Sequence, residues 1–148
     1  YYDSQLVLVV KKGSKYENAT SLSDFAGAKV TAQLNTFHYS VIDQITGVEK
    51  VTAMDNFPAM RVALQAGTID AYVSELPEAL SAQAANSDFV MVKLTNGFQT
   101  SPEDTQTAVG VRKDSTLTKE INEALKTISS EQRLQIMQDA IKNQPAAE

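Results

Sequence analysis

Cysteine is absent from this 148-residue chain, and histidine occurs once, as His38. Without cysteine the chain has no disulfide framework, no thiolate zinc site and no cysteine nucleophile, whichever redox compartment it occupies. A single histidine offers no second imidazole for a zinc site. A chain of this length buries about 70% of the surface that its unfolded form exposes, so its core needs no metal for stability. We therefore expect no cofactor and no metal.

Basic side chains are few: 13 Lys and Arg stand against 18 Asp and Glu, giving a net charge of −5. They form no cluster of the kind that phosphate backbones require, so we expect no nucleic-acid partner. The longest apolar runs, such as Leu6–Val10, fall far short of the roughly 20 residues that cross a bilayer. The chain begins at Tyr1 without a basic and apolar leader, and we interpret it as a piece of a longer protein whose export signal was removed or lay upstream.

Common enzyme motifs are also missing. The sequence contains no G-x-G-x-x-G, no G-x-x-x-x-G-K-[ST] and no G-x-S-x-G, which removes the usual signatures of dinucleotide binding, phosphate transfer and serine hydrolysis. The carboxylate pairs Glu103/Asp104 and Asp70/Glu75 are of a kind that 18 acidic residues produce by chance. We predict no catalytic residues and no enzyme activity.

Short apolar runs alternate with amphipathic ones, which predicts strands alternating with helices and a mostly parallel sheet covered on both faces. The expected strands are Ser4–Lys12, Ala28–Leu34, Val48–Ala53, Ile69–Ser74, Phe89–Leu94 and Gln106–Arg112. The expected helices are Phe37–Thr46, Asn56–Gln65, Glu75–Ala85, Leu117–Ser129 and Glu131–Lys142, with one short turn over Ser21–Gly27. We expect a loop over Thr95–Thr105 and a frayed tail over Asn143–Glu148.

One candidate site is the segment Gln33–Phe37, where a predicted strand ends and a predicted helix begins. Backbone N–H groups at a helix start lack partners within the helix and carry the positive end of its dipole, so they can hold a carboxylate. The Thr36 hydroxyl adds a further donor. The alternative is that Asn35 or Thr36 only caps its own helix.

A second candidate site is Glu75, at the tip of the strand that precedes the next helix. Ligands of open α/β sheets bind beyond the carboxyl ends of the strands, so an amine-binding Glu75 could face the same crevice as the Gln33–Phe37 turn. An anion receptor beside a carboxylate suits a zwitterion. The alternative is that Glu75 is a first-turn acid favoured by the helix dipole. We expect His38 to be a helix cap or a surface residue.

Four segments together resemble the second half of an extracellular solute-binding protein of the polar amino-acid ABC-transporter family, which has the type II periplasmic-binding fold. The resemblance covers essentially the whole chain and implies an α/β fold, a three-layer α/β/α lobe with a mostly parallel sheet and one antiparallel crossing strand. The segments are Tyr1–Val10, Ser21–Val30, Ala66–Tyr72 with Glu75 and Pro77 after it, and Thr107–Ser115.

The resemblance also implies roles for individual residues. Asn35-Thr36 matches the family's G-T pair, in which the Thr and neighbouring N–H groups bind the α-carboxylate of an amino acid. Asn replaces Gly here, and Asn is the other residue best tolerated in left-handed backbone. Glu75 matches the family's Asp that binds the α-ammonium, with one more methylene. Gln33 and Phe37 flank the turn and are expected to touch the ligand, whereas Asp70 is expected to be structural.

By this resemblance, residues 1–112 form the second, ligand-binding lobe with its crossing strands. Residues 113–148 form a helical segment that packs in the family on a first lobe not included in this chain; without it, domain swapping or dimerisation would bury the apolar stripe. The implied partners are a polar amino acid, glutamine first by analogy, and the membrane permease of an ABC transporter. The implied location is extracellular or periplasmic, with any membrane anchor outside this chain.

Two alternatives stay open. Sensor kinases and transcription regulators use similar domains to sense small ligands. A dehydratase-like enzyme on the same fold would need a general acid or base in the cleft, for which Glu75 and His38 are the candidates.

Overall fold

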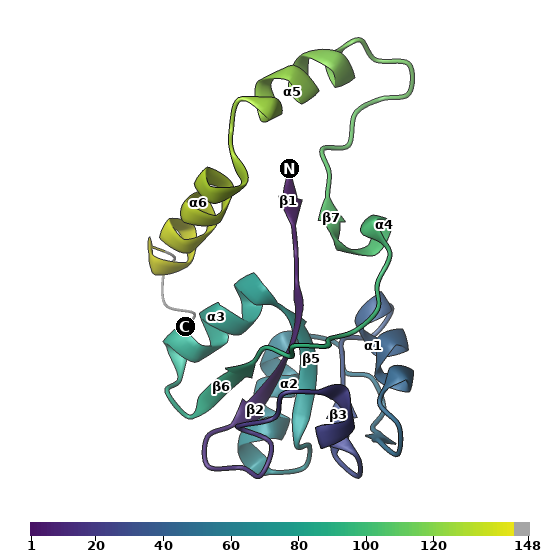
Figure 1. The fold of residues 1–148 in the computed structure, drawn as a ribbon, viewed down its shortest axis with the longest axis vertical. Helices are drawn as coiled ribbons and strands as arrows, with labels where there is room; N and C mark the ends of the chain where they lie inside the picture. Colours follow the sequence, from purple (N-terminus) through teal and green to yellow (C-terminus); the bar gives the residue numbers. More distant parts are fainter. Residues whose placement is uncertain (144–148) are drawn as a thin grey trace.

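The computed structural model describes residues 1–143, which form one α/β lobe and a helical arm (Figure 1). The main sheet has five strands in the order β4-β3-β5-β2-β6. They are β2 (Leu6–Lys11), β3 (Lys29–Thr31), β4 (Glu49–Lys50), β5 (Ala71–Glu75) and β6 (Phe89–Val92). A separate two-stranded ribbon pairs β1 (Tyr2–Asp3) with β7 (Gln106–Thr107).

Strand β2 is the centre of the fold. Its run Leu6–Val10 is buried on both faces, as a continuous apolar run predicts. It pairs antiparallel with β5 and with β6, whereas β3 pairs parallel with both β4 and β5. The sheet is therefore mostly parallel with one antiparallel crossing strand, which confirms the fold class expected from the sequence.

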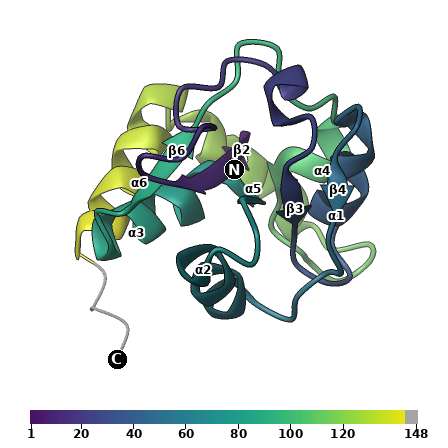
Figure 2. The same cartoon turned by 90° about the horizontal axis from the view of Figure 1, so that it is seen from below.

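Alternating side chains of β2 divide the core into two layers. Leu6, Leu8 and Val10 pack with η1 (Leu22–Phe25), α1 (Phe37–Val41) and η2 (Ile42–Gln44). Val7 and Val9 pack on the opposite face with α2 (Phe57–Ala66) and α3 (Leu76–Ala85). Helices thus cover both faces of the sheet (Figure 2), which is the expected three-layer α/β/α arrangement.

Local signals predicted the helix ends well. In α2 the Asn56 side chain accepts a hydrogen bond from the Ala59 amide, and Gly67 ends the helix in the left-handed region at φ 74°. The expected helix over Phe37–Thr46 is instead split into α1 and η2. The expected loop over Thr95–Thr105 includes one helical turn, α4 (Pro102–Thr105).

The predicted strand Gln106–Arg112 is wrong in its length. Only Gln106–Thr107 forms a strand, because its partner in the ribbon, β1, is itself two residues long. The remaining expected strands exist but are shorter than predicted, since ladder hydrogen bonds begin and end where a neighbouring strand does.

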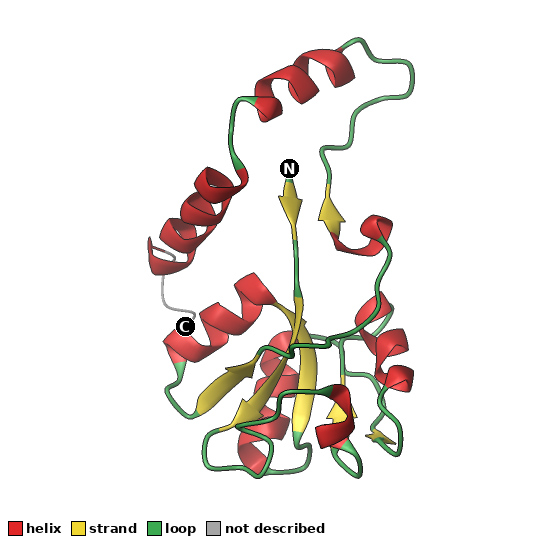
Figure 3. Ribbon diagram, in the orientation of Figure 1, coloured by secondary structure: helices red, strands yellow, loops and turns green. Residues whose placement is uncertain are grey.

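Two helices, α5 (Leu117–Lys126) and α6 (Ser130–Asn143), form an arm that leaves the lobe after β7 and returns to contact α3 through α6 (Figure 3). Neither has a buried residue, and Leu117, Leu134 and Ile136 are exposed. The Arg133 guanidinium donates to the carbonyls of Leu125, Ile128 and Tyr1, which ties the arm to itself and to the start of the chain. Most of the predicted tail lies outside the described residues. Among residues 1–143, no helix combines the length and apolar character needed to cross a membrane.

Candidate functional site

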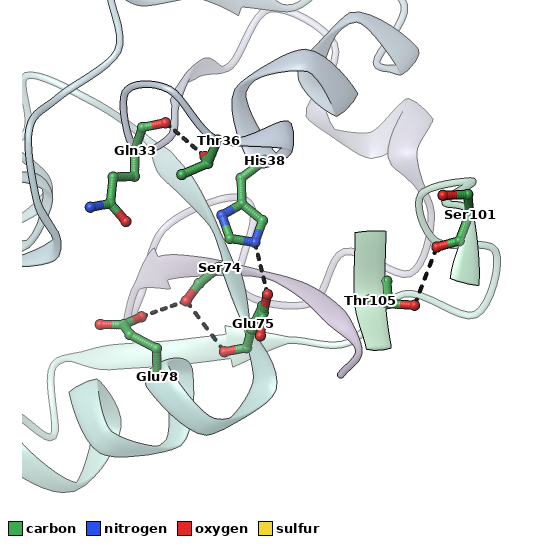
Figure 4. A network of polar contacts seen from close by, with 8 residues as sticks. All are labelled: Gln33, Thr36, His38, Ser74, Glu75, Glu78, Ser101 and Thr105. Atoms are coloured by element: carbon green, nitrogen blue, oxygen red, sulfur yellow. Dashed lines mark hydrogen bonds and ion pairs between the residues drawn. The ribbon is translucent and has the colours of Figure 1, made fainter. Parts of the chain in front are cut away.

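The two predicted site segments lie at the same edge of the sheet (Figure 4). Strands β3 and β5 are parallel neighbours, with Val30 opposite Ala71 and Thr31 opposite Tyr72. Their carboxyl ends therefore point in the same direction, and polar residues lie at the end of β5 and shortly after β3. The chain after β3 forms the turn Gln33–Phe37, and β5 ends at Glu75. This is the edge at which ligands bind in open α/β sheets.

The turn Gln33–Phe37 is held in one conformation by short-range hydrogen bonds. Asn35 has φ 61°, the left-handed region in which Asn is the best tolerated non-glycine residue. The Leu34 amide donates to the Met54 carbonyl at 2.8 Å, and the Gln33 side-chain amide donates to the Asp55 carbonyl at 3.1 Å. The turn is thus tied to the segment after β4.

Thr36 occupies the N-cap position of α1 but does not act as a cap. Its hydroxyl donates to the Gln33 carbonyl at 2.7 Å, and its side chain makes no capping bond to the helix. Asn35 precedes the cap position. Thr36 thus occupies the cap position without the side-chain bond that the capping alternative predicts. Within residues 1–143, the Thr36 side chain leaves the first amides of α1 uncapped.

Glu75 lies at the end of β5 and is contacted by His38 of α1. The distance from His38 Nε2 to Glu75 Oε1 is 3.2 Å. The hydrogen bond from His38 lowers the pKa of the Glu75 carboxyl below its ordinary value, against the opposing effect of burial. An ionised carboxylate only accepts hydrogen bonds, so Nε2 carries the proton in this pair. Glu75 makes no capping bond to α3.

The expectation that His38 is a cap or a surface residue is wrong. Its side chain is only 9% exposed, whereas that of Glu75 is 33% exposed. The His38 ring lies 4.4 Å from the Phe37 ring, centroid to centroid, and its Nδ1 atom is buried without a hydrogen-bond partner. Glu75 thus satisfies one nitrogen of the buried imidazole, and Phe37 packs against its ring.

A second polar cluster joins α2 and α3 to Ser74, the residue of β5 that precedes Glu75. Arg61 of α2 forms an ion pair with Glu78 of α3 at 2.6 Å, and the Ser74 hydroxyl donates to Glu78 at 2.5 Å. Burial raises the pKa of the neighbouring Tyr72 hydroxyl, and the Glu78 charge acts in the same direction. This cluster fixes the junction between β5 and α3. Sequence reasoning missed it because Arg61 and Glu78 belong to different helices.

Asp70 has the structural role expected for it. Its carboxylate accepts a hydrogen bond from the Lys29 amide at 2.8 Å, at the start of β3 and therefore at the opposite edge of the sheet from Glu75. Within residues 1–143, His, Asp and Glu form no group of three that could hold a metal ion.

A cavity of about 240 Å³ adjoins the same edge, between the start of β2 and the loop that follows β6. Leu6, which lines it, is the register partner of Glu75. All of its lining side chains are uncharged: Ser4, Gln5, Leu6, Leu94, Thr95, Gly97, Phe98, Thr100 and Thr105.

Comparisons with protein-family models and with curated proteins find no match. Comparison with solved structures does. The holo form of ArgBP from T. maritima is 28% identical with a TM-score of 0.67, and 90% of this chain covers 57% of it. The amino-acid ABC transporter substrate-binding protein AbpA from Streptococcus pneumoniae, bound to L-arginine, is 25% identical with a TM-score of 0.73; 96% of this chain covers 59% of it. The chain is homologous to substrate-binding proteins of amino-acid ABC transporters.

The chain spans less than two thirds of the length of those homologues. A structure of domain 2 from TmArgBP, 27% identical with a TM-score of 0.54, is matched over its whole length by 66% of this chain. The chain thus corresponds to one lobe of these proteins, as its sequence predicted. The two full-length homologues named above are described as binding proteins, and AbpA is bound to L-arginine in its structure.

Proposed function

We propose that this lobe binds a polar amino acid by its α-carboxylate and its α-ammonium group. The observation that carries the proposal is the shared sheet edge: the Gln33–Phe37 turn follows β3, and the Glu75 carboxylate ends the parallel neighbour β5. Unpaired amides and a hydroxyl bind a carboxylate, and a carboxylate binds an ammonium group. The two sites together select a zwitterion.

Thr36 and Asn35 form the carboxylate receptor in this proposal. Asn35, at φ 61°, turns the backbone just before α1, and in this proposal the amides at the start of α1 face the ligand. On binding, the Thr36 hydroxyl exchanges its bond to the Gln33 carbonyl for one to the ligand. Gln33 and Phe37 flank this turn and contact the ligand from either side.

Glu75 forms the ammonium receptor. The homologues of known structure support an amino acid as ligand, and L-arginine is the first to test because it is bound in AbpA. L-Glutamine is the second, since the side chains that line the cavity beside Glu75 are uncharged and match a neutral amide better than a guanidinium.

The test is amide chemical-shift mapping on the isotope-labelled 148-residue chain, with L-arginine and L-glutamine as ligands. We expect shifts at residues 33–37 and at Glu75. Agmatine keeps the guanidinium and an amine but lacks the α-carboxylate, so it should leave the turn unperturbed. N-acetyl-L-arginine keeps the carboxylate but lacks the α-ammonium, so it should leave Glu75 unperturbed.

Matched variants separate the two receptors from general effects on folding. Thr36→Val should weaken binding of the intact amino acid, whereas Thr68→Val, at the opposite edge of the sheet, should not. Each charged hydrogen bond removed should cost about 1.5–3 kcal/mol of binding free energy. The proposal would be overturned if agmatine or N-acetyl-L-arginine bound as tightly as L-arginine. Chemical-shift changes confined to residues other than 33–37 and Glu75 would also overturn it.

We further propose that residues 1–112 form the ligand-binding lobe and that the arm after them packs on the remainder of a two-lobed protein. The exposed side chains of Leu117, Leu134 and Ile136 support an arm with a missing partner. In this proposal the whole protein works outside the cytoplasm and closes its two lobes on the amino acid for delivery to a membrane permease.

A further inference from the structure

We infer that His38 is a positioning residue for ligand binding: it holds the Glu75 carboxylate in the orientation that receives the α-ammonium group. The inference rests on the proposed function and deepens it. It makes the selectivity for an unmodified amine depend on His38, which acts through Glu75 and not by contact with the ligand. No motif in the sequence points to His38, and only the fold brings it to Glu75.

The geometry supports this role. The Nε2–H of His38 meets Glu75 Oε1 at 3.2 Å, and the two residues come from α1 and β5, 37 positions apart. The imidazole is 9% exposed, and Phe37 packs against its ring at 4.4 Å. The ring therefore has little freedom to turn. Glu75 keeps a third of its side chain exposed, so His38 holds the carboxylate while one side stays open to a ligand.

A fixed carboxylate matters here because glutamate is a long and flexible side chain. An unrestrained Glu75 would have to be ordered when the ligand binds, and that lost freedom would lower the affinity. His38 imposes the order in the free protein. The pair also links the two receptors physically, because His38 belongs to the same short helix whose start faces the carboxylate site.

The test compares four variants: His38→Phe, which keeps an aromatic ring but loses the donor; His38→Gln, which keeps a donor; Glu75→Asp; and Ser40→Ala, on the exposed side of α1, as the matched control. For each, we would measure the affinity for L-arginine and L-glutamine and for their N-acetyl derivatives by calorimetry or shift titration. Thermal unfolding of each variant confirms that it is folded.

We expect His38→Phe to weaken binding of the free amino acid roughly 3- to 10-fold, the effect of releasing one side chain that must then be ordered on binding. Binding of the N-acetyl derivative should not change, because that ligand does not use Glu75. His38→Gln should recover most of the loss. A purely structural role for His38 would instead weaken both ligands equally.

The outcomes separate the inference from the proposed function. A wild-type chain that binds the free amino acid and its N-acetyl derivative equally, or binds neither, overturns the proposed function and the inference with it. A wild-type preference for the free amino acid that survives His38→Phe unchanged overturns the inference alone.

Discussion

His38 Nε2 and Glu75 Oε1 lie 3.2 Å apart, and their hydrogen bond joins helix α1 to the end of strand β5. The bond lowers the pKa of the Glu75 carboxyl from its ordinary value of 4.5. The folded state therefore favours the ionised carboxylate more than the unfolded state does. This stabilisation is present above the unfolded-state pKa and is lost as the pH falls through the lower folded-state value.

Glu75→Gln should remove this pH-dependent stabilisation. At neutral pH we expect the variant to have a free energy of unfolding about 1 kcal/mol lower than the wild type, the usual contribution of one hydrogen bond. The difference should shrink as the pH falls below 4.5 and through the lowered pKa of the wild-type Glu75 carboxyl, because the carboxylate becomes protonated there. Urea unfolding across this range measures it, with Glu49→Gln, an exposed glutamate, as control. A difference that stays constant with pH would contradict the prediction.

Replacing Arg61 should destabilise the protein more than replacing both partners of its ion pair. The pair with Glu78 is mostly buried, with the two side chains 23% and 16% exposed. Arg61→Leu leaves the Glu78 carboxylate without its counter-charge, which should lower the free energy of unfolding by about 2–3 kcal/mol. The double variant Arg61→Leu with Glu78→Leu should cost less than Arg61→Leu alone, and therefore less than the sum of the single changes. Additive costs in a double-mutant cycle would show that the pair is not coupled.

Those parts of the fold that depend on local chemistry were predictable from the sequence. The apolar run of β2 predicted a strand buried on both faces, and Asn56 and Gly67 marked the two ends of α2. The order of strands and helices placed Thr36 and Glu75 at strand ends, which is why the structure finds them at one edge of the sheet.

Interactions between distant residues were not predictable. His38 and Glu75 are 37 positions apart, and their spacing in the sequence carries no sign of the contact, so the single histidine was expected at the surface. The length of β7 depends on how far β1 extends to pair with it, and nothing within Gln106–Arg112 records that. The cavity beside Glu75 was missed for the same reason, because the start of β2, the loop after β6 and the end of α4 all contribute to its lining.

Asn35 should tolerate glycine and resist a β-branched residue. Its φ of 61° lies in the left-handed region, which glycine adopts without a Cβ clash. Asn35→Gly should change the free energy of unfolding by less than about 1 kcal/mol, whereas Asn35→Val should lower it by about 1–2 kcal/mol. Chemical unfolding of both variants gives the comparison, and Leu34→Val, at an exposed position in the same turn, controls for the side chain itself. Equal effects of Gly and Val would mean that the turn relaxes to another conformation.

Removing the arm should leave the lobe folded. Both core clusters are built from residues up to Phe98, so truncation after Arg112 deletes no core side chain. The lost contacts include those of α6 with α3 and the bond from Arg133 to the Tyr1 carbonyl. We expect a cooperative thermal transition within about 5 °C of that of the full chain, which corresponds to roughly 1 kcal/mol.

Leu8→Ala in the truncated chain is the control for core packing and should cost about 3 kcal/mol. The truncated chain should also associate less in sedimentation experiments, because it lacks the exposed Leu117, Leu134 and Ile136. Loss of cooperative unfolding on truncation would instead show that the arm is part of the folding unit and that the boundary near residue 112 is misplaced.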